Sequence, residues 1–225
     1  MSPPPLVIAH RGVHKTGLTE NTMAAFRAAI DAGADMIELD VRRTGAGELA
    51  ILHDHAIGKV TLDSCSLDEF EAQTGLRPPL LAEVLEWARG RIGLDVELKE
   101  DGYVAQLAPL LLDFACSSSD LIVTSFLDPV LTALHEQAPA LQLGLLLTWT
   151  TDRFEQRAYA CGAKTVLPEM KLIDEALVAG TKNAGLDLIA WDFMAAKDPQ
   201  LLADPRVKGV ITDDVASAFA ALAAR

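Results

Sequence analysis

Apolar runs alternate with segments of helical period along the whole chain. The runs have the near-continuous apolar character of parallel strands covered on both faces, and they lie at 6–9, 36–41, 92–97, 121–124, 141–147, 164–167, 187–191 and 208–211. Helical spacing follows each run, at 22–32, 80–88, 103–116, 128–138, 152–161, 173–184, 198–203 and 215–223. Eight strand–helix units with short links predict an α/β fold, a (β/α)8 barrel. The same alternation is also compatible with an open, doubly wound sheet.

One segment does not follow this alternation. Residues 42–79 lie between the second strand and its helix, and they contain the short apolar run "ELAIL" and a helical pattern near 67–73. The rest of the chain has no linker or low-complexity tract. We therefore expect a single domain, residues 1–225, in which a small insertion of about 42–79 follows strand 2.

The first two strands end in charged side chains. The run "VIAHRG" delivers His10 and Arg11, and in "MIELDV" the residues Glu38 and Asp40 share one face because side chains alternate along a strand. In a parallel barrel the active site lies at the carboxyl ends of the strands. These side chains are therefore predicted to meet at the barrel mouth.

The third strand repeats the arrangement. In "LDVELK", Asp95, Glu97 and Lys99 share a face. Glu97 completes a carboxylate triad with Glu38 and Asp40, and buried carboxylates repel one another unless a cation compensates them. Oxygen ligands alone favour one hard divalent cation, Mg²⁺ or Ca²⁺. The alternative is a metal-free network of buried ion pairs, such as Glu38 with Lys99.

A second histidine ends the short run "ELAILHD". A single histidine is most often structural, but His53 and His10 both follow apolar runs and accompany three carboxylates, an arginine and a lysine. Arginine and lysine bind phosphate oxygens, and two imidazoles serve as acid and base near neutral pH. The set predicts metal-assisted phosphoryl transfer.

Charge and composition narrow the partners. The net charge of −13 disfavours nucleic acid and anionic membranes, and no apolar run approaches the roughly 18 residues of a membrane span. The amino-terminal residues lack the basic region and cleavage site of a signal peptide, and the three cysteines form no CxxC motif. We expect a cytoplasmic monomer or homodimer that acts on a small molecule and associates stably with no membrane.

The motifs "AHRG", "ENTMAAFRAAIDAGADMIELDV", "LHD" and "LDVELK" occur in this order over the first hundred residues. Together they resemble the glycerophosphodiester phosphodiesterases, and weaker similarity continues through "SFLDP", "GLDLIAW" and "GVITDD". The resemblance implies a TIM barrel with a small insertion after strand 2. It also implies hydrolysis of glycerophosphodiesters to glycerol 3-phosphate and an alcohol with a divalent cation.

The resemblance also suggests a role for each site residue. It implies His10 and His53 as the acid/base pair, Glu38, Asp40 and Glu97 as metal ligands, and Arg11 and Lys99 as phosphate-binding residues. Glu20 and Asn21 belong to the "ENT" motif and would orient the groups that contact the ligands, although Asn21 also suits a helix N-cap. Phe126 and Trp191 would be the apolar walls around the glycerol, or ordinary core aromatics.

Some points stay open at this stage. After Trp191 the chain has Asp192, Phe193 and Met194, where the family often has Thr, an apolar residue and Asn. This departure affects the shape of the pocket and the choice of phosphodiester.

We expect Asp213 to begin a helix rather than to act as a catalytic residue. Alternative functions are a lysophospholipase D acting on lysophospholipids and a non-catalytic barrel that binds phosphorylated ligands. The nucleophile is water or a glycerol hydroxyl.

Overall fold

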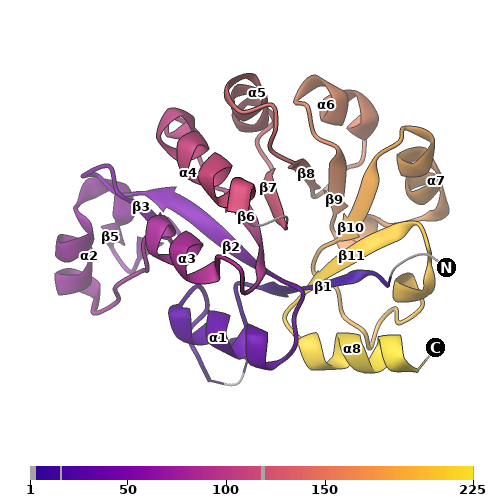
Figure 1. The fold of residues 1–225 in the computed structure, drawn as a ribbon, viewed down its shortest axis with the longest axis horizontal. Coiled ribbons are helices and arrows are strands. Elements are labelled where there is room, and N and C mark those ends of the chain that lie inside the picture. Colours follow the sequence, from indigo (N-terminus) through magenta and orange to yellow (C-terminus); the bar gives the residue numbers. More distant parts are fainter. Residues whose placement is uncertain (1–3, 16, 118–119, 225) are drawn as a thin grey trace.

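Eight parallel strands close into a barrel in the computed structural model, which describes residues 4–15, 17–117 and 120–224 (Figure 1). The strands are β1 (Leu6–His10), β2 (Met36–Arg43), β6 (Gly93–Leu98), β7 (Leu121–Ser125), β8 (Leu143–Leu147), β9 (Thr165–Pro168), β10 (Asp187–Ala190) and β11 (Val207–Thr212). Strand β1 pairs with β2 on one side and with β11 on the other. This closure confirms the predicted barrel and excludes the open sheet.

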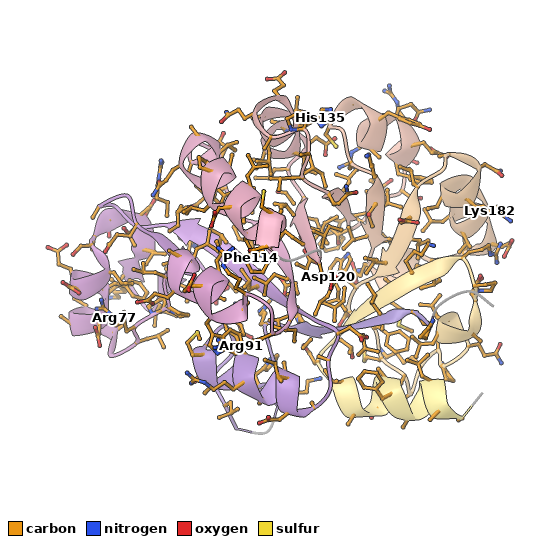
Figure 2. The ribbon with its side chains drawn as sticks, in the orientation of Figure 1. Arg77, Arg91, Phe114, Asp120, His135 and Lys182 are labelled. Atoms are coloured by element: carbon orange, nitrogen blue, oxygen red, sulfur yellow. The ribbon has the colours of Figure 1, made fainter. Side chains whose placement is uncertain are left out.

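Seven helices surround the strands in the described part of the chain: α1 (Met23–Asp31), α3 (Leu81–Ala88), α4 (Val104–Ser117), α5 (Asp128–Gln137), α6 (Phe154–Ala160), α7 (Glu175–Asn183) and α8 (Val215–Ala223). The prediction of a helix at 198–203 was wrong, because only the 3-10 turn η3 (Leu201–Ala203) forms there. Pro205 disfavours helical backbone at Asp204, so too few residues remain after Pro199 for a helix. His135 on α5 and Lys182 on α7 lie on the outer rim of the molecule (Figure 2).

The barrel interior has an apolar layer. Its members point inward from seven strands and are Ile8, Met36, Ile122, Leu146, Leu167, Ile189 and Ile211. A much larger apolar cluster fills the space between the strands and the helices. Because side chains alternate along each strand, the next inward positions toward the mouth are the polar ones on β1, β2 and β6.

Register brings these polar positions level with one another. His10 on β1 pairs with Glu38 on β2, and Asp40 on β2 pairs with Glu97 on β6. Neighbouring strands are about 4.8 Å apart, so paired inward side chains are in contact range. The sheet itself therefore assembles most of the predicted site.

The insertion after β2 forms a small layer beside the barrel. It contains β3 (Leu49–Ile51), which runs antiparallel to β2, the hairpin strands β4 (Ala56–Ile57) and β5 (Val60–Thr61), the turn η1 (Leu62–Ser64) and α2 (Leu67–Thr74). In Figure 1 it projects to one side of the barrel. Phe70, Leu62 and Leu67 are fully buried in its own apolar cluster. The amide of Leu52 donates to the carbonyl of Asp40 at 2.9 Å, which brings the following residue, His53, to the end of β2.

Among the described residues, none of the helices combines the length and the apolar character that crossing a membrane requires.

Candidate active site

The carboxyl ends of the strands surround a cavity of about 130 Å³, which we call the mouth cavity. Its walls include eight of the residues predicted from the sequence: His10, Arg11, Glu38, His53, Glu97, Lys99, Phe126 and Trp191. Of the other three, Asp40 and Glu20 contact Arg11, and Asn21 contacts Asp40. The structure thus brings the whole predicted set together.

Three buried carboxylates form the centre of the site. Glu38, Asp40 and Glu97 each offer one oxygen, and these atoms all lie within 4.8 Å of one another. Burial raises the pKa of Glu38 well above its usual range, and the charges of Asp40 and Glu97 raise it further. Burial also raises the pKa of Glu97, although Lys99 opposes the change. Burial and mutual repulsion therefore both oppose full ionisation of the cluster.

Lys99 is the main cation of this cluster. Its Nζ lies 2.8 Å from Asp40 Oδ1 and 2.6 Å from Glu97 Oε1. Burial alone would lower the pKa of Lys99, but Asp40 and Glu97 outweigh it and raise the pKa. The ion pairs of Lys99 are thus with Asp40 and Glu97, and not with Glu38, the example given for the alternative, metal-free network.

Arg11 contacts the cluster through its side chain and its backbone. Its Nε lies 3.3 Å from Asp40 Oδ2, its Nη1 donates to Glu20 Oε1 at 2.9 Å, and its amide donates to Glu38 Oε2 at 3.0 Å. The next residue, Gly12, has φ of +78°, and a Cβ there would lie 2.7 Å from the backbone of Ala25 in α1. Only glycine allows this turn and this close approach of the helix.

Asn21 holds Asp40 and does not cap the helix. Its Nδ2 donates to Asp40 Oδ2 at 2.6 Å, and its side chain is buried. The N-cap of α1 is Thr22, whose hydroxyl accepts from the amide of Ala25. Lys99, Arg11 and Asn21 together outweigh the effect of burial on Asp40 and lower its pKa.

His10 is held by an aspartate that the sequence analysis assigned to a helix start. Asp213 Oδ1 lies 2.6 Å from His10 Nδ1, and Lys15 Nζ lies 3.2 Å from Asp213 Oδ2. The hydrogen bond with His10 lowers the pKa of Asp213. The helix start is instead Asp214, whose carboxylate accepts from the amide of Ser217. Asp213 directly follows β11. Its position at the carboxyl end of a strand is the sequence feature that could have assigned it to the site.

The second histidine also has a carboxylate partner. His53 Nδ1 lies 2.8 Å from Asp54 Oδ1, and the His53 carbonyl accepts from Arg42 Nε at 2.7 Å. Burial lowers the pKa of His53, and the positive charge of Lys99 lowers it further. Both effects favour the neutral imidazole.

Asp95 is a fourth buried carboxyl, at the base of the mouth cavity. It pairs in register with Glu38, it is fully buried, and its Oδ1 accepts from Thr124 Oγ1 at 2.7 Å. Its Oδ2 has no hydrogen-bond partner among the described residues. Burial raises the pKa of Asp95 to about 7. The sequence placed Asp95 on the correct face but gave it no part in the site.

Phe126 and Trp191 form an apolar wall. Their ring centroids are 5.6 Å apart in an edge-to-face arrangement, and Trp191 Nε1 donates to the carbonyl of Leu147 at 3.1 Å. Both rings pack on the apolar layer inside the barrel and both line the mouth cavity. On one side they pack into the core, and on the other they line the mouth cavity.

The donor set suits a hard divalent cation. The oxygens of three carboxylates converge, and the cations in contact with them are Lys99 and Arg11, which leaves one negative charge when all three are ionised. Among the described residues, the contacts of the Glu38 carboxylate are an amide hydrogen bond from Arg11 and a distant imidazole, with His10 Nε2 at 4.0 Å. Such oxygen sets bind Mg²⁺ or Ca²⁺. Beside them lie two cationic side chains and two imidazoles, which are groups that bind an anion and move protons.

Comparison with known proteins gives a consistent result. The profile of the glycerophosphoryl diester phosphodiesterase family matches residues 10–217. A glycerophosphodiester phosphodiesterase of Caldanaerobacter subterraneus subsp. tengcongensis is 31% identical over 230 residues, which cover 93% of this chain and 94% of the relative.

Solved structures share the fold. A glycerophosphodiester phosphodiesterase from Parabacteroides distasonis superposes with a TM-score of 0.84 at 22% identity, over 100% of this chain and 99% of that one. An Oleispira antarctica phosphodiesterase in complex with the product sn-glycerol-3-phosphate also has a TM-score of 0.84, at 21% identity, over 98% of this chain and 97% of that one.

Proposed function

The chain belongs to the glycerophosphoryl diester phosphodiesterase family, and we propose that it hydrolyses glycerophosphodiesters to glycerol 3-phosphate and an alcohol. The observation that carries this proposal is the convergence of the three carboxylates and the two imidazoles on the mouth cavity. The product named for the Oleispira antarctica relative agrees with it.

One divalent cation, Mg²⁺ or Ca²⁺, belongs to the proposal. Glu38, Asp40 and Glu97 would hold it, since their oxygens converge and their charge is not balanced. When bound, the cation supplies a positive charge that offsets the charge of the phosphate and polarises its oxygens. Asn21 and Arg11 fix the orientation of Asp40 from behind.

Arg11 and Lys99 would bind the phosphate. Both have cationic groups beside the mouth cavity, and both contact the carboxylate cluster that would hold the cation. Charge-assisted hydrogen bonds to phosphate oxygens orient the diester for attack. The glycerol arm then packs against Phe126 and Trp191, whose rings present the apolar wall of the same cavity.

The two histidines would divide the proton transfers. Asp213 contacts Nδ1 of His10 and leaves Nε2 facing the mouth cavity, so His10 is placed to donate a proton from Nε2 to the leaving alcohol. His53, whose pKa is lowered by burial and by Lys99, is suited to accept a proton from the nucleophile. General acid–base catalysis of this kind contributes about 10²- to 10⁴-fold in rate.

The test is hydrolysis of glycerophosphocholine and glycerophosphoethanolamine, followed by ³¹P NMR, after removal of metal with EDTA and return of Mg²⁺ or Ca²⁺. We expect metal-dependent release of glycerol 3-phosphate. A transient cyclic phosphate would identify a glycerol hydroxyl as the nucleophile, and its absence at every time point would identify water.

Variants test the histidines separately. We expect His10→Ala and His53→Ala each to lower kcat by about 10²- to 10⁴-fold. His135→Ala is the matched control, because His135 is exposed on α5 at the outer rim (Figure 2). Near-full activity of both mouth variants would contradict the assignment.

A further inference from the structure

A second cavity, of about 220 Å³, adjoins the mouth cavity at His10. His10 and Ile211 line both cavities. The two edges of the imidazole face different sides: Nε2 lies 4.0 Å from Glu38 in the mouth cavity, and Nδ1 lies 2.6 Å from Asp213, which lines the second cavity. His10 thus stands between the two spaces.

The second cavity is lined by the segment after β10, which includes Asp192, Phe193 and Met194. Phe193 is buried, and its amide donates to the carbonyl of Ile211 at 3.0 Å, which fixes the segment against β11. The space is large enough for an alcohol of several non-hydrogen atoms, since one water molecule occupies about 30 Å³ of liquid.

The charges on its walls are unbalanced. Asp213 contacts the His10 imidazole and the Lys15 ammonium group, and the Asp214 carboxylate caps α8. Asp192 is exposed and makes no hydrogen bond or salt bridge to any residue within 4–15, 17–117 and 120–224. Its carboxylate therefore remains available to a ligand in this cavity.

We propose that the second cavity is the subsite for the alcohol arm of the phosphodiester, and that Asp192 selects alcohols that carry a positively charged amine. The inference rests on the proposed function. A phosphodiester carries two arms on one phosphorus atom. With the glycerol arm against Phe126 and Trp191, the other arm extends past His10, and this is also the residue suited to protonate the alcohol as it leaves.

The experiment compares substrates that differ in the charge of the alcohol. The kcat/KM values are measured for glycerophosphocholine and glycerophosphoethanolamine, which are cationic in that arm, and for glycerophosphoglycerol, which is neutral. We expect Asp192→Asn to lower the ratio of cationic to neutral kcat/KM by about three- to fivefold, the effect of one solvent-exposed ion pair. The matched control is Asp187→Asn, an exposed aspartate at the opposite end of β10, which should leave the ratio unchanged.

A second variant tests the space rather than the charge. Ala196 lines the second cavity and is exposed, so Ala196→Trp can fill the cavity without disturbing the core. It should lower kcat/KM for glycerophosphocholine, and this fold-loss should be at least about ten times the fold-loss for the methyl ester of glycerol 3-phosphate. The methyl ester places only one carbon in the second cavity.

The outcomes separate the two proposals. If the wild-type protein hydrolyses these diesters but both variants keep its substrate ratios, the alcohol subsite is refuted and the proposed function stands. If the wild-type protein hydrolyses none of them with any metal, the proposed function fails, and the subsite fails with it.

Discussion

Asp95→Asn should stabilise the metal-free protein, and the gain should grow as the pH rises. Asparagine has the shape of aspartate and keeps an oxygen that can accept the hydrogen bond from Thr124, which is 2.7 Å in the wild-type structure. What it removes is a carboxyl that is fully buried, with an oxygen that has no hydrogen-bond partner among the described residues.

The magnitude follows from the pKa of Asp95, which burial raises from its ordinary value of 3.8 to about 7. A carboxyl with a raised pKa binds its proton more tightly in the folded state than in the unfolded state. Its contribution to stability is therefore fully present below about pH 4, falls as the pH rises, and is lost above about pH 7. A change of this size corresponds to about 4 kcal/mol.

The assay is urea unfolding in EDTA at pH values from 4 to 8, with wild type and variant compared at each pH. The difference in unfolding free energy should be near zero at the acid end and should approach about 4 kcal/mol in favour of the variant at pH 8. Asp187→Asn, an exposed control, should stay within about 0.5 kcal/mol of wild type. A difference for Asp95→Asn that does not change with pH would refute the reasoning.

The remaining predictions concern other parts of the site and its supports. Asp213→Asn should lower kcat by about tenfold or more. In a protein that already carries His10→Ala it should cause little further loss of kcat, because Asp213 acts through the His10 ring. Fully additive losses in steady-state kinetics would contradict this. Mg²⁺ or Ca²⁺ at about 100 times its Kd should stabilise the wild type by about 2.7 kcal/mol and raise its Tm by about 5–10 °C in scanning fluorimetry. The rise in Tm should be much smaller for Glu38→Gln, which removes one of the three carboxylates. Thr22→Ala should cost about 1 kcal/mol in urea unfolding through loss of the α1 cap, and Thr22→Ser should restore most of it. Gly12→Ala should cost at least about 2 kcal/mol, because its φ is +78° and a Cβ would lie against the backbone of α1; a change below about 0.5 kcal/mol would show that the turn can relax.

The barrel was predictable because its strands are covered on both faces and therefore read as unbroken apolar runs. The metal-site candidates were predictable for a related reason. A charged residue at every second position of a strand identifies one face, and the parallel register places Asp40 level with Glu97. Both arguments depend on the spacing of apolar and charged residues within a single strand, and this spacing can be read from the sequence.

Asn21 and Asp213, the two residues considered as helix starts, lie where strands pass into helices. Asn21 has φ of +55°, and the helix cap falls one residue later, at Thr22. Asp213 likewise precedes the true cap, Asp214. In each pair the first polar residue turns back into the site and the second caps the helix. Spacing cannot distinguish the two, because the direction of the turn depends on the packing of the loop.

The hydrogen bond between Asp213 and His10 joins residues 203 positions apart in the chain. The carboxylate cluster, in contrast, comes from the neighbouring strands β2 and β6, both within the first hundred residues. During synthesis, the strands that carry the carboxylate cluster therefore leave the ribosome long before Asp213 does. His10 gains its carboxylate partner only when β11 pairs with β1, so this hydrogen bond is absent from any chain that ends before β11.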